Sequence, residues 1–312
     1  MKEIQPKRTI GKLYSGLGVA GAILVLNAAC GTQEALPSPL PVRESLPPVD
    51  QARVLESAFR LDGSGFIFIP DNNFPKDNFA VEVLLKPDPP SEMLSQITER
   101  GEVLPEDLYT ILSQHNGTGE DFTLTMYTRK DPDNRITYSY IVRLTDANNP
   151  VDTLSNNCPI IAGYGVEKTV ALEDFTKPKK VSLKVKKGKP EVFEDGKKVR
   201  MKLGHEYTTP DGYSTFEQGK YLNNGEYLAN TLAVSSCNTI GIGLGIGGAV
   251  FPDGTMAGHF NGIVYRATAR NLAVAGVEQV VAAWDFTTGS LEDISSNGHT
   301  AAIVGKASLI EK

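Results

Sequence analysis

Tyrosines and amide side chains gather in one polar stretch of the sequence, between residues 206 and 232. A tyrosine ring can cover the C–H groups of a sugar while neighbouring amides bond to its hydroxyls. We therefore expect a long loop that binds carbohydrate, although the tyrosines could instead cover a sheet beneath the loop. The expected ligand contacts are Tyr213, Tyr221, Asn223, Asn224 and Tyr227.

Cationic side chains concentrate between residues 177 and 202, where lysines alternate with Val, Leu and Phe. Lysines on the wet face of a strand protect a sheet edge from pairing with another chain. The same run taken alone could also form a patch for nucleic acid or an anionic glycan. A nucleic-acid partner is not expected, because the formal net charge of the chain is -6. The sequence also has no Cys-x-x-Cys pair and no phosphate-binding glycine loop, so we expect no zinc or nucleotide site.

The first 30 residues resemble an export address, with a basic head, an apolar run and two alanines before Cys30. This order resembles the bacterial lipoprotein signal, in which the cysteine carries lipid. Asn27 stands where that signal usually has Leu, Val or Ile, so an uncleaved signal anchor is the alternative. Both interpretations predict a protein of the cell envelope that is anchored to the membrane and lies outside the cytoplasm.

The remaining cysteines form an even pair if Cys30 is lipidated. Disulfides persist in the oxidising compartment that an exported protein enters. We therefore expect a bond between Cys158 and Cys237 that pins two long loops together, with two buried free thiols as the alternative.

The rest of the chain divides into a linker and one domain. Residues 31–54 are rich in proline and poor in aromatic residues, which predicts an extended tether without a core. Residues 55–312 then form a single domain, since β-sandwiches of about 200–250 residues often fold as one unit.

Short alternating segments, separated by Gly, Asn, Asp and Pro, dominate this domain and predict an all-β, two-sheet antiparallel sandwich. Asp195-Gly196 predicts a two-residue hairpin turn, with Glu194 opposite Lys197. Short helical turns are expected only near residues 91–99 and 105–109. The predicted strands include Phe66–Ile69, Ala80–Leu85, Phe122–Tyr127, Ile136–Val142, Val181–Lys186, Thr239–Leu244, Gly262–Ala269, Val280–Phe286 and Ala301–Val304.

Five segments, in this order, resemble the laminin-G-like members of the concanavalin A-like lectin/glucanase family. They are Leu61–Pro87, Val192–Lys197, Ile240–Gly243, Phe260–Tyr265 with Arg270–Leu272, and Ala283–Phe286 with Asp293–Gly298. Together they extend over most of residues 61–304. The resemblance implies a jelly-roll sandwich, and a scaffold of this kind hosts many unrelated functions.

Calcium is the cofactor that the resemblance implies, held by carboxylate, amide and carbonyl oxygens in loops. The densest oxygen cluster contains Asp71, Asn73 and Asp77, and Asp293 with Asn297 forms a second. The alternative is that these residues only form turns, which Asp and Asn favour.

The glycoside hydrolases of this family suggest one catalytic hypothesis. They need two carboxylates beside the sugar bond, and the family supplies them from one strand. The nearest equivalents here are Glu191, Glu194 and Asp195, whose spacing differs. We interpret them as a solvated hairpin turn.

The alginate lyases of this fold suggest another catalytic hypothesis. Their three catalytic elements resemble, in order, Arg100-Gly101-Glu102, Gln114-His115-Asn116 and Tyr221–Tyr227. Gln114 and His115 would neutralise the uronate and Tyr227 would take the proton beside it. Asn223 and Ala229 replace the lysine and glutamine of the family pattern, and residues 114–117 could simply form a strand exit and turn.

The sequence therefore favours a surface-tethered, non-catalytic carbohydrate-binding or adhesion module. Its expected partner is a carbohydrate or an envelope or surface protein. A polysaccharide lyase acting on uronates and a structural envelope protein are the alternatives.

Overall fold

The chain is seen in a computed structural model. It describes residues 57–70, 78–90, 96–97, 103–104, 107–116, 119–131, 133–145, 160–186, 189–208, 214–218, 241–250, 256–257, 260–272, 278–295 and 297–311. All of them belong to one compact unit, Ala52–Lys312. No helix among these residues is long and apolar enough to span a membrane. The predicted export address and linker lie outside the described residues.

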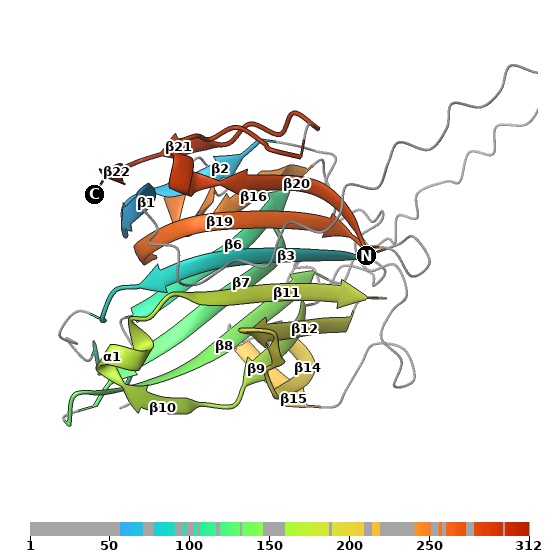
Figure 1. Ribbon diagram of the computed structural model, residues 1–312. Helices are drawn as coiled ribbons and strands as arrows, with labels where there is room; N and C mark the ends of the chain where they lie inside the picture. The colour runs from blue at the N-terminus through green and yellow to red at the C-terminus, as the bar shows by residue number, and fades with distance from the viewer. Residues whose placement is uncertain are drawn as a thin grey trace, which may run out of the picture. The chain divides into compact units, whose positions relative to one another are not determined.

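Two antiparallel sheets make up this unit (Figure 1), which confirms the predicted two-sheet sandwich. Sheet A has eight strands in the order β13-β12-β11-β3-β19-β1-β22, with β20 paired to β19 beside that path. Its strands are β1 (Ser57–Asp62), β3 (Phe79–Pro87), β11 (Lys179–Lys186), β12 (Lys189–Glu194), β13 (Lys197–Lys198), β19 (Asn261–Asn271), β20 (Gln279–Asp285) and β22 (Ala307–Glu311).

Sheet B has ten strands in the order β15-β14-β9-β8-β7-β6-β16-β2-β21, with β10 paired to β8. Its strands are β2 (Phe66–Ile69), β6 (Asp107–Asn116), β7 (Gly119–Lys130), β8 (Arg135–Thr145), β9 (Ile160–Gly165), β10 (Lys168–Ala171), β14 (Met201–Thr208), β15 (Ser214–Gln218), β16 (Gly241–Ile246) and β21 (Ala302–Val304).

Smaller elements complete the described structure. Two short hairpins pair β4 with β5 and β17 with β18, the first at Gln96–Ile97 and Val103–Leu104, the second at Ala249–Val250 and Met256–Ala257. A single helical turn, α1 (Leu172–Phe175), and a 3₁₀ helix, η1 (Phe286–Thr288), are the helices of the described residues.

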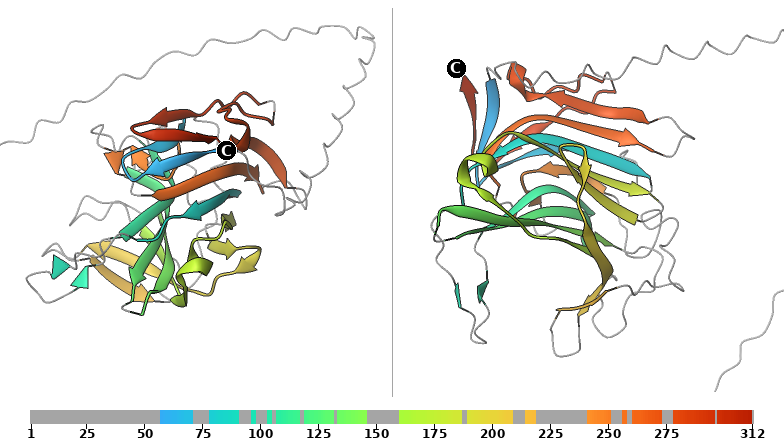
Figure 2. Two further views of the ribbon diagram at one scale, coloured as in Figure 1. Left: turned by 60° about the vertical axis from the view of Figure 1, so that its left-hand side comes forward. Right: turned by 60° about the horizontal axis from the view of Figure 1, so that its bottom comes forward.

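The core lies between the two sheets, which Figure 2 shows as two layers. Alternation along β3 turns Val81, Val83 and Leu85 inward, where each is at most 3% exposed. Trp284 on β20 is 1% exposed, and its indole Nε1–H donates to the carbonyl of His299 at 2.7 Å. Burying each large side chain of this kind stabilises the fold by about 1.5–3 kcal/mol.

The predicted hairpin turn is confirmed at Asp195 and Gly196. Both residues have positive φ, 49° and 74°, as a two-residue turn of this type requires. Glu194 and Lys197 are backbone partners across the turn. Their side chains do not pair, because Glu194 follows Val192 on the inward face of β12 and Lys197 is exposed.

The nine strands predicted from alternation are all present, with ends that differ by a few residues. The helical turn predicted near residues 105–109 is wrong, since β6 begins at Asp107 and pairs there with Thr128 of β7. Within the other predicted turn, Gln96 and Ile97 form β4. Sheet pairing supplies backbone hydrogen bonds that a weak local helical preference cannot match.

Candidate functional site

Four side chains on neighbouring strands meet on the outer face of sheet B, the face turned away from the core. Val142 of β8 is fully buried, so Arg143 points to the opposite face. The register of β8, β9, β14 and β15 brings Tyr164, Glu206 and Phe216 to that same face. We call Arg143, Tyr164, Glu206 and Phe216 the outer cluster.

Glu206 is the polar centre of the outer cluster. Arg143 donates from Nε to Glu206 Oε2 at 3.0 Å and from Nη2 to Oε1 at 3.4 Å, which is a two-pronged contact. The Tyr164 hydroxyl donates to Oε2 at 3.1 Å. The rings of Tyr164 and Phe216 meet edge to face with centroids 4.8 Å apart. The cluster therefore presents an aromatic pair beside a neutralised ion pair.

The titration of the outer cluster favours hydrogen bonding over proton transfer. Burial and the charge of Glu206 both raise the pKa of Tyr164, so its hydroxyl keeps its proton at neutral pH. Burial lowers the pKa of Arg143, but the hydrogen bond and charge of Glu206 outweigh it and raise that pKa. A protonated tyrosine and a permanently charged arginine can bind a ligand but cannot act as a base.

The outer cluster overlaps the tyrosine-rich stretch that the sequence singled out. The prediction that all of residues 206–232 form one loop is wrong at its beginning, because residues up to Thr208 belong to β14 and Ser214–Gln218 form β15. Tyr213 directly precedes β15, which carries Phe216. The five predicted ligand contacts, Tyr213, Tyr221, Asn223, Asn224 and Tyr227, lie outside the described residues and stay predictions.

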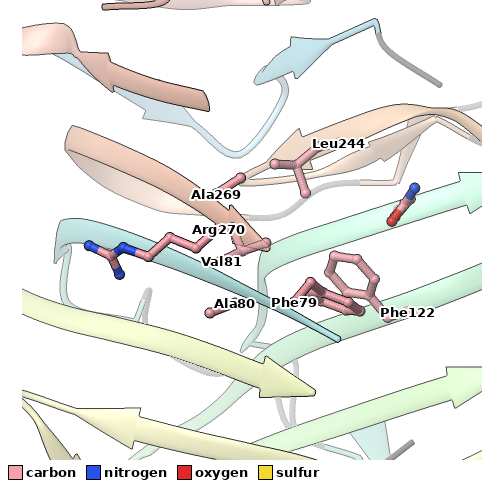
Figure 3. Close-up of a pocket in the computed structure, with 8 residues that line it drawn as sticks. Phe79, Ala80, Val81, Phe122, Leu244, Ala269 and Arg270 are labelled. Atoms are coloured by element: carbon pink, nitrogen blue, oxygen red, sulfur yellow. The ribbon is translucent and has the colours of Figure 1, made fainter. Parts of the chain in front are cut away.

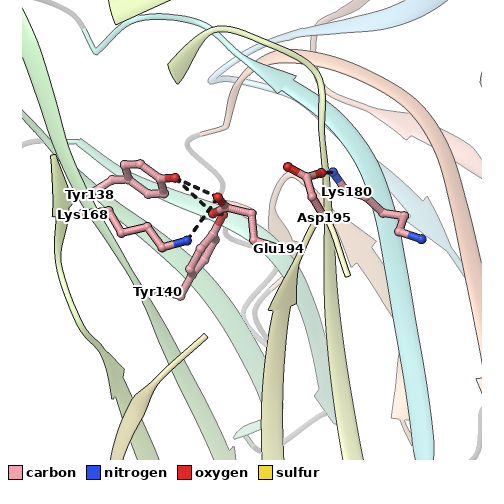
Figure 4. A network of polar contacts seen from close by, with 6 residues as sticks. All are labelled: Tyr138, Tyr140, Lys168, Lys180, Glu194 and Asp195. Carbon is pink, nitrogen blue, oxygen red and sulfur yellow. Dashed lines mark hydrogen bonds and ion pairs between the residues drawn. The ribbon is translucent and has the colours of Figure 1, made fainter. Parts of the chain in front are cut away.

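A second carboxylate, Glu194, lies between the sheets at the end of β12 (Figure 4). The Tyr140 hydroxyl donates to it at 2.6 Å and the Tyr138 hydroxyl at 2.9 Å, both from β8 of the other sheet. Lys168 of β10 forms an ion pair with it at 3.2 Å. We call Glu194, Tyr138, Tyr140, Lys168 and the nearby Lys179 the inter-sheet cluster. The interpretation of Glu194 as a solvated turn residue is therefore wrong.

Electrostatics in the inter-sheet cluster favour a charged carboxylate among protonated tyrosines. Burial alone would raise the pKa of Glu194, but the Tyr140 hydrogen bond and the Lys168 charge outweigh it and lower that pKa. Burial, and then the charge of Glu194, raises the pKa of Tyr140, which is 1% exposed. Lys179 Nζ sits 4.7 Å from the centroids of the Tyr138 and Phe175 rings. The cluster ties the two sheets together, and its tyrosine rings are buried away from any ligand.

The inward side of β6 holds the glutamine of the lyase alternative. Gln114 is 4% exposed and lines a cavity of about 10 Å³ inside the sandwich, together with Phe79, Phe122 and Leu244 (Figure 3). Such a volume accepts at most about one water molecule. This position argues against contact between Gln114 and a polysaccharide. His115 is the next residue of β6, and its side chain, like Tyr227, lies outside the described residues.

The loop after β20 contains the second predicted calcium pair. The Asp293 carboxylate accepts backbone hydrogen bonds from Ala283 at 2.9 Å, Ser295 at 2.8 Å and His299 at 3.2 Å. Burial raises the pKa of Asp293, but these bonds outweigh it and lower that pKa. Asn297 donates to the carbonyl of Val281 at 2.6 Å. Both side chains thus serve to fold the loop.

No group of three His, Cys, Asp or Glu side chains is placed to hold a metal ion within the part of the chain that the structure describes. Asp71, Asn73 and Asp77 lie outside that part, so a calcium site there stays a prediction. Cys30, Cys158 and Cys237 also lie outside it, and lipidation and the disulfide stay predictions as well.

Sequence comparison finds no matching family model and no matching curated protein. Several solved structures resemble this chain, two of which follow. One is mouse laminin α1 chain, domains LG4-5, at 12% identity and a TM-score of 0.31; the match covers 74% of this chain but only 46% of the laminin structure. The other is a Ruminococcus gnavus IT-sialidase CBM40 bound to α2,3 sialyllactose, at 13% identity and a TM-score of 0.30, with 69% and 91% covered.

Proposed function

We propose that residues 55–312 form a surface-tethered, non-catalytic carbohydrate-binding or adhesion module whose ligand lies across the outer face of sheet B. One observation carries this proposal: the outer cluster places an aromatic pair and a fixed polar centre on strands β9, β14 and β15, and the last two contain the described part of the tyrosine-rich stretch. Aromatic rings cover sugar C–H groups, and fixed polar groups orient the hydroxyls. The predicted export address accounts for the tether.

The geometry of the outer cluster supports binding rather than catalysis. A glycosidase needs two carboxyl groups with separate roles, one of them protonated. Glu206 is the single carboxylate of the cluster and is occupied by Arg143 and Tyr164. Tyr164 keeps its proton at neutral pH because its pKa is raised, so little phenolate is present to act as a base. The cluster can therefore hold a sugar without a group that would cleave it.

The proposal is tested by retention of the unit Ala52–Lys312 on a panel of immobilised polysaccharides, with calcium and with a chelator. Phe216→Ala should weaken binding to the retained polymer about tenfold, because it removes one ring of the aromatic pair. The matched control is Phe193→Ala, the same change at a half-buried position on sheet A. Phe193→Ala should leave retention unchanged.

Three outcomes would overturn the proposal. Equal losses in the two variants would show that the outer cluster has no special role. Absence of retention on every polymer, with recovery of one envelope protein by crosslinking, would favour a structural protein. Release of an ultraviolet-absorbing unsaturated product from a uronate polymer would favour a lyase.

A further inference from the structure

A pocket lies at the corner where the chain passes from sheet A to sheet B. β13 ends at Lys198 in sheet A, and β14 begins at Met201 in sheet B. The pocket has a volume of about 520 Å³, within the range of about 300–1,000 Å³ that is common for ligand sites. We call it the corner pocket. Its walls are Lys189, Pro190, Glu191, Lys198, Val199, Arg200, Met201, Lys202, Leu203 and Gln218.

The walls of the corner pocket are strongly cationic in a chain whose formal net charge is -6. Lys189, Lys198, Arg200 and Lys202 face a single carboxylate, Glu191, which is ion-paired with Lys198. Arg200 and Lys202 are exposed, and neither has a carboxylate partner among the described residues. Like charges gathered around one pocket repel each other, and an anion that enters the pocket relieves that repulsion.

Protection of sheet edges explains only part of this arrangement. β13 pairs with β12 only at Phe193 and Glu194, and β15 pairs with β14 only from Gly204 onward. Lys198 and Lys202 therefore lie on short edges that no strand of the described residues extends, where lysines discourage pairing with another chain. Edge protection does not explain why the two edges enclose a cavity. It also does not explain why Arg200 lines that cavity.

The corner pocket adjoins the outer cluster. Lys202 is the backbone partner of Tyr164, and its alternation places it on the outer face of sheet B. Gln218 lies two residues after Phe216 on β15 and on the same face. A polymer that crosses the aromatic pair can thus reach the pocket without leaving the sheet.

We propose that the corner pocket binds the carboxylate or sulfate group of an acidic polysaccharide whose neighbouring sugars lie on the outer cluster. The proposal rests on the proposed function and names its ligand class. Arg200 would contact the anionic group with its planar fork, and Lys202 would add a point charge. The volume exceeds what a small inorganic anion fills, which favours a sugar unit that carries the charge.

The test compares two doubly substituted forms of Ala52–Lys312 that lose the same charge. R200Q/K202Q removes the two cations without a carboxylate partner from the pocket. K177Q/K306Q removes two exposed lysines that do not line the pocket and is the matched control. Affinities are measured for polygalacturonate, dextran sulfate and neutral dextran, which separate a carboxylate ligand, a sulfate ligand and a neutral one.

R200Q/K202Q should weaken binding of one acidic polymer at least about tenfold, with neutral dextran unaffected and the control within about twofold. The remaining affinity should also depend less on salt than in the unsubstituted protein. Equal affinities in the two double variants would contradict the proposed role of the corner pocket. The carbohydrate function would remain intact if Phe216→Ala still weakens binding about tenfold. Binding of neutral dextran but of neither acidic polymer would also contradict the proposed role of the pocket and leave the carbohydrate function intact.

Two further outcomes complete the test. Binding of no polysaccharide at all would overturn the proposed function together with the pocket. Tighter binding of a DNA oligonucleotide than of either acidic polymer, lost in R200Q/K202Q, would overturn the ligand class, because the pocket would then recognise phosphate.

Discussion

The inter-sheet cluster and the outer cluster are built from the same residue types, with opposite consequences. Each centres on a glutamate that accepts a hydrogen bond from tyrosine and pairs with a cation. The glutamate side chains are almost equally exposed, 13% for Glu194 and 11% for Glu206. Exposure of the carboxylate therefore does not distinguish a structural cluster from a candidate binding surface.

The two clusters differ in how exposed the partners of each glutamate are. Tyr140 is 1% exposed because it points into the core, whereas Tyr164 is half-buried on the outer face. Arg143 retains 32% of its side-chain exposure. A ligand could reach the tyrosine and arginine of the outer cluster, but it could not reach the Tyr140 hydroxyl without separating the sheets. The comparison predicts that substitutions in one cluster change stability and in the other change binding.

The largest effect is expected at Glu194. Glu194→Ala leaves the buried Tyr140 hydroxyl without its acceptor and removes the negative charge that faces Lys179. This should cost about 3–5 kcal/mol in the free energy of unfolding. The measurement is urea denaturation of Ala52–Lys312. The control is Glu191→Ala, since Glu191 lies on the same hairpin strand but forms a more exposed pair with Lys198. That control should cost at most about 1 kcal/mol, and equal losses would contradict the inter-sheet role of Glu194.

A smaller effect on stability, joined to an effect on binding, is expected at Arg143. Arg143→Lys keeps the charge but loses the two-pronged contact with Glu206, which should cost about 1–2 kcal/mol in unfolding free energy. Because Tyr164 shares the same acceptor, polysaccharide affinity should also fall about threefold or more. Denaturation and affinity measurements on one preparation check both. A variant with lower stability and unchanged affinity would make the outer cluster structural, like its counterpart.

Alternation in the sequence accounts for much of the fold and for part of each cluster. The strand predicted at Ile136–Val142 already places Tyr138 and Tyr140 on one face with buried aliphatic residues, and buried tyrosine hydroxyls need partners. That partner could not be predicted, because Glu194 lies 54 residues after Tyr140 and on the other sheet. Its position next to a turn suggested solvent instead.

The outer cluster and the corner pocket were harder to predict because both depend on the order of strands in a sheet. Arg143, Tyr164 and Glu206 belong to three separate segments, and only the order β14-β9-β8 makes them neighbours. The lysine-rich run was visible, but the step from sheet A to sheet B at Val199 and Arg200 has no turn signal in the sequence. Local pattern predicts which face a residue takes, and sheet order decides what it meets there.

A moderate pH effect should separate the two glutamates further. The pKa of Glu194 is lowered in the folded state, so its contribution to stability is present above the unfolded value of 4.5 and is lost as pH falls through the folded pKa. Below about pH 5, the unsubstituted protein should therefore lose more of its unfolding free energy than Glu194→Gln does. Denaturation at a series of pH values measures this difference. Parallel curves for the two proteins would show that Glu194 does not titrate differently on folding.

The smallest effect is expected at Lys168, which tests what holds the inter-sheet cluster together. Lys168 forms an ion pair with Glu194, but its side chain is 43% exposed, so water screens much of the attraction. Lys168→Gln should change the unfolding free energy by at most about 0.5 kcal/mol. Tyr140→Phe removes only a hydroxyl, yet it should cost about 1–2 kcal/mol because a charged acceptor loses a buried donor. If Lys168→Gln cost more unfolding free energy than Tyr140→Phe, charge pairing rather than hydrogen bonding would hold the two sheets together. The inter-sheet cluster would then no longer differ from the outer cluster in the way proposed.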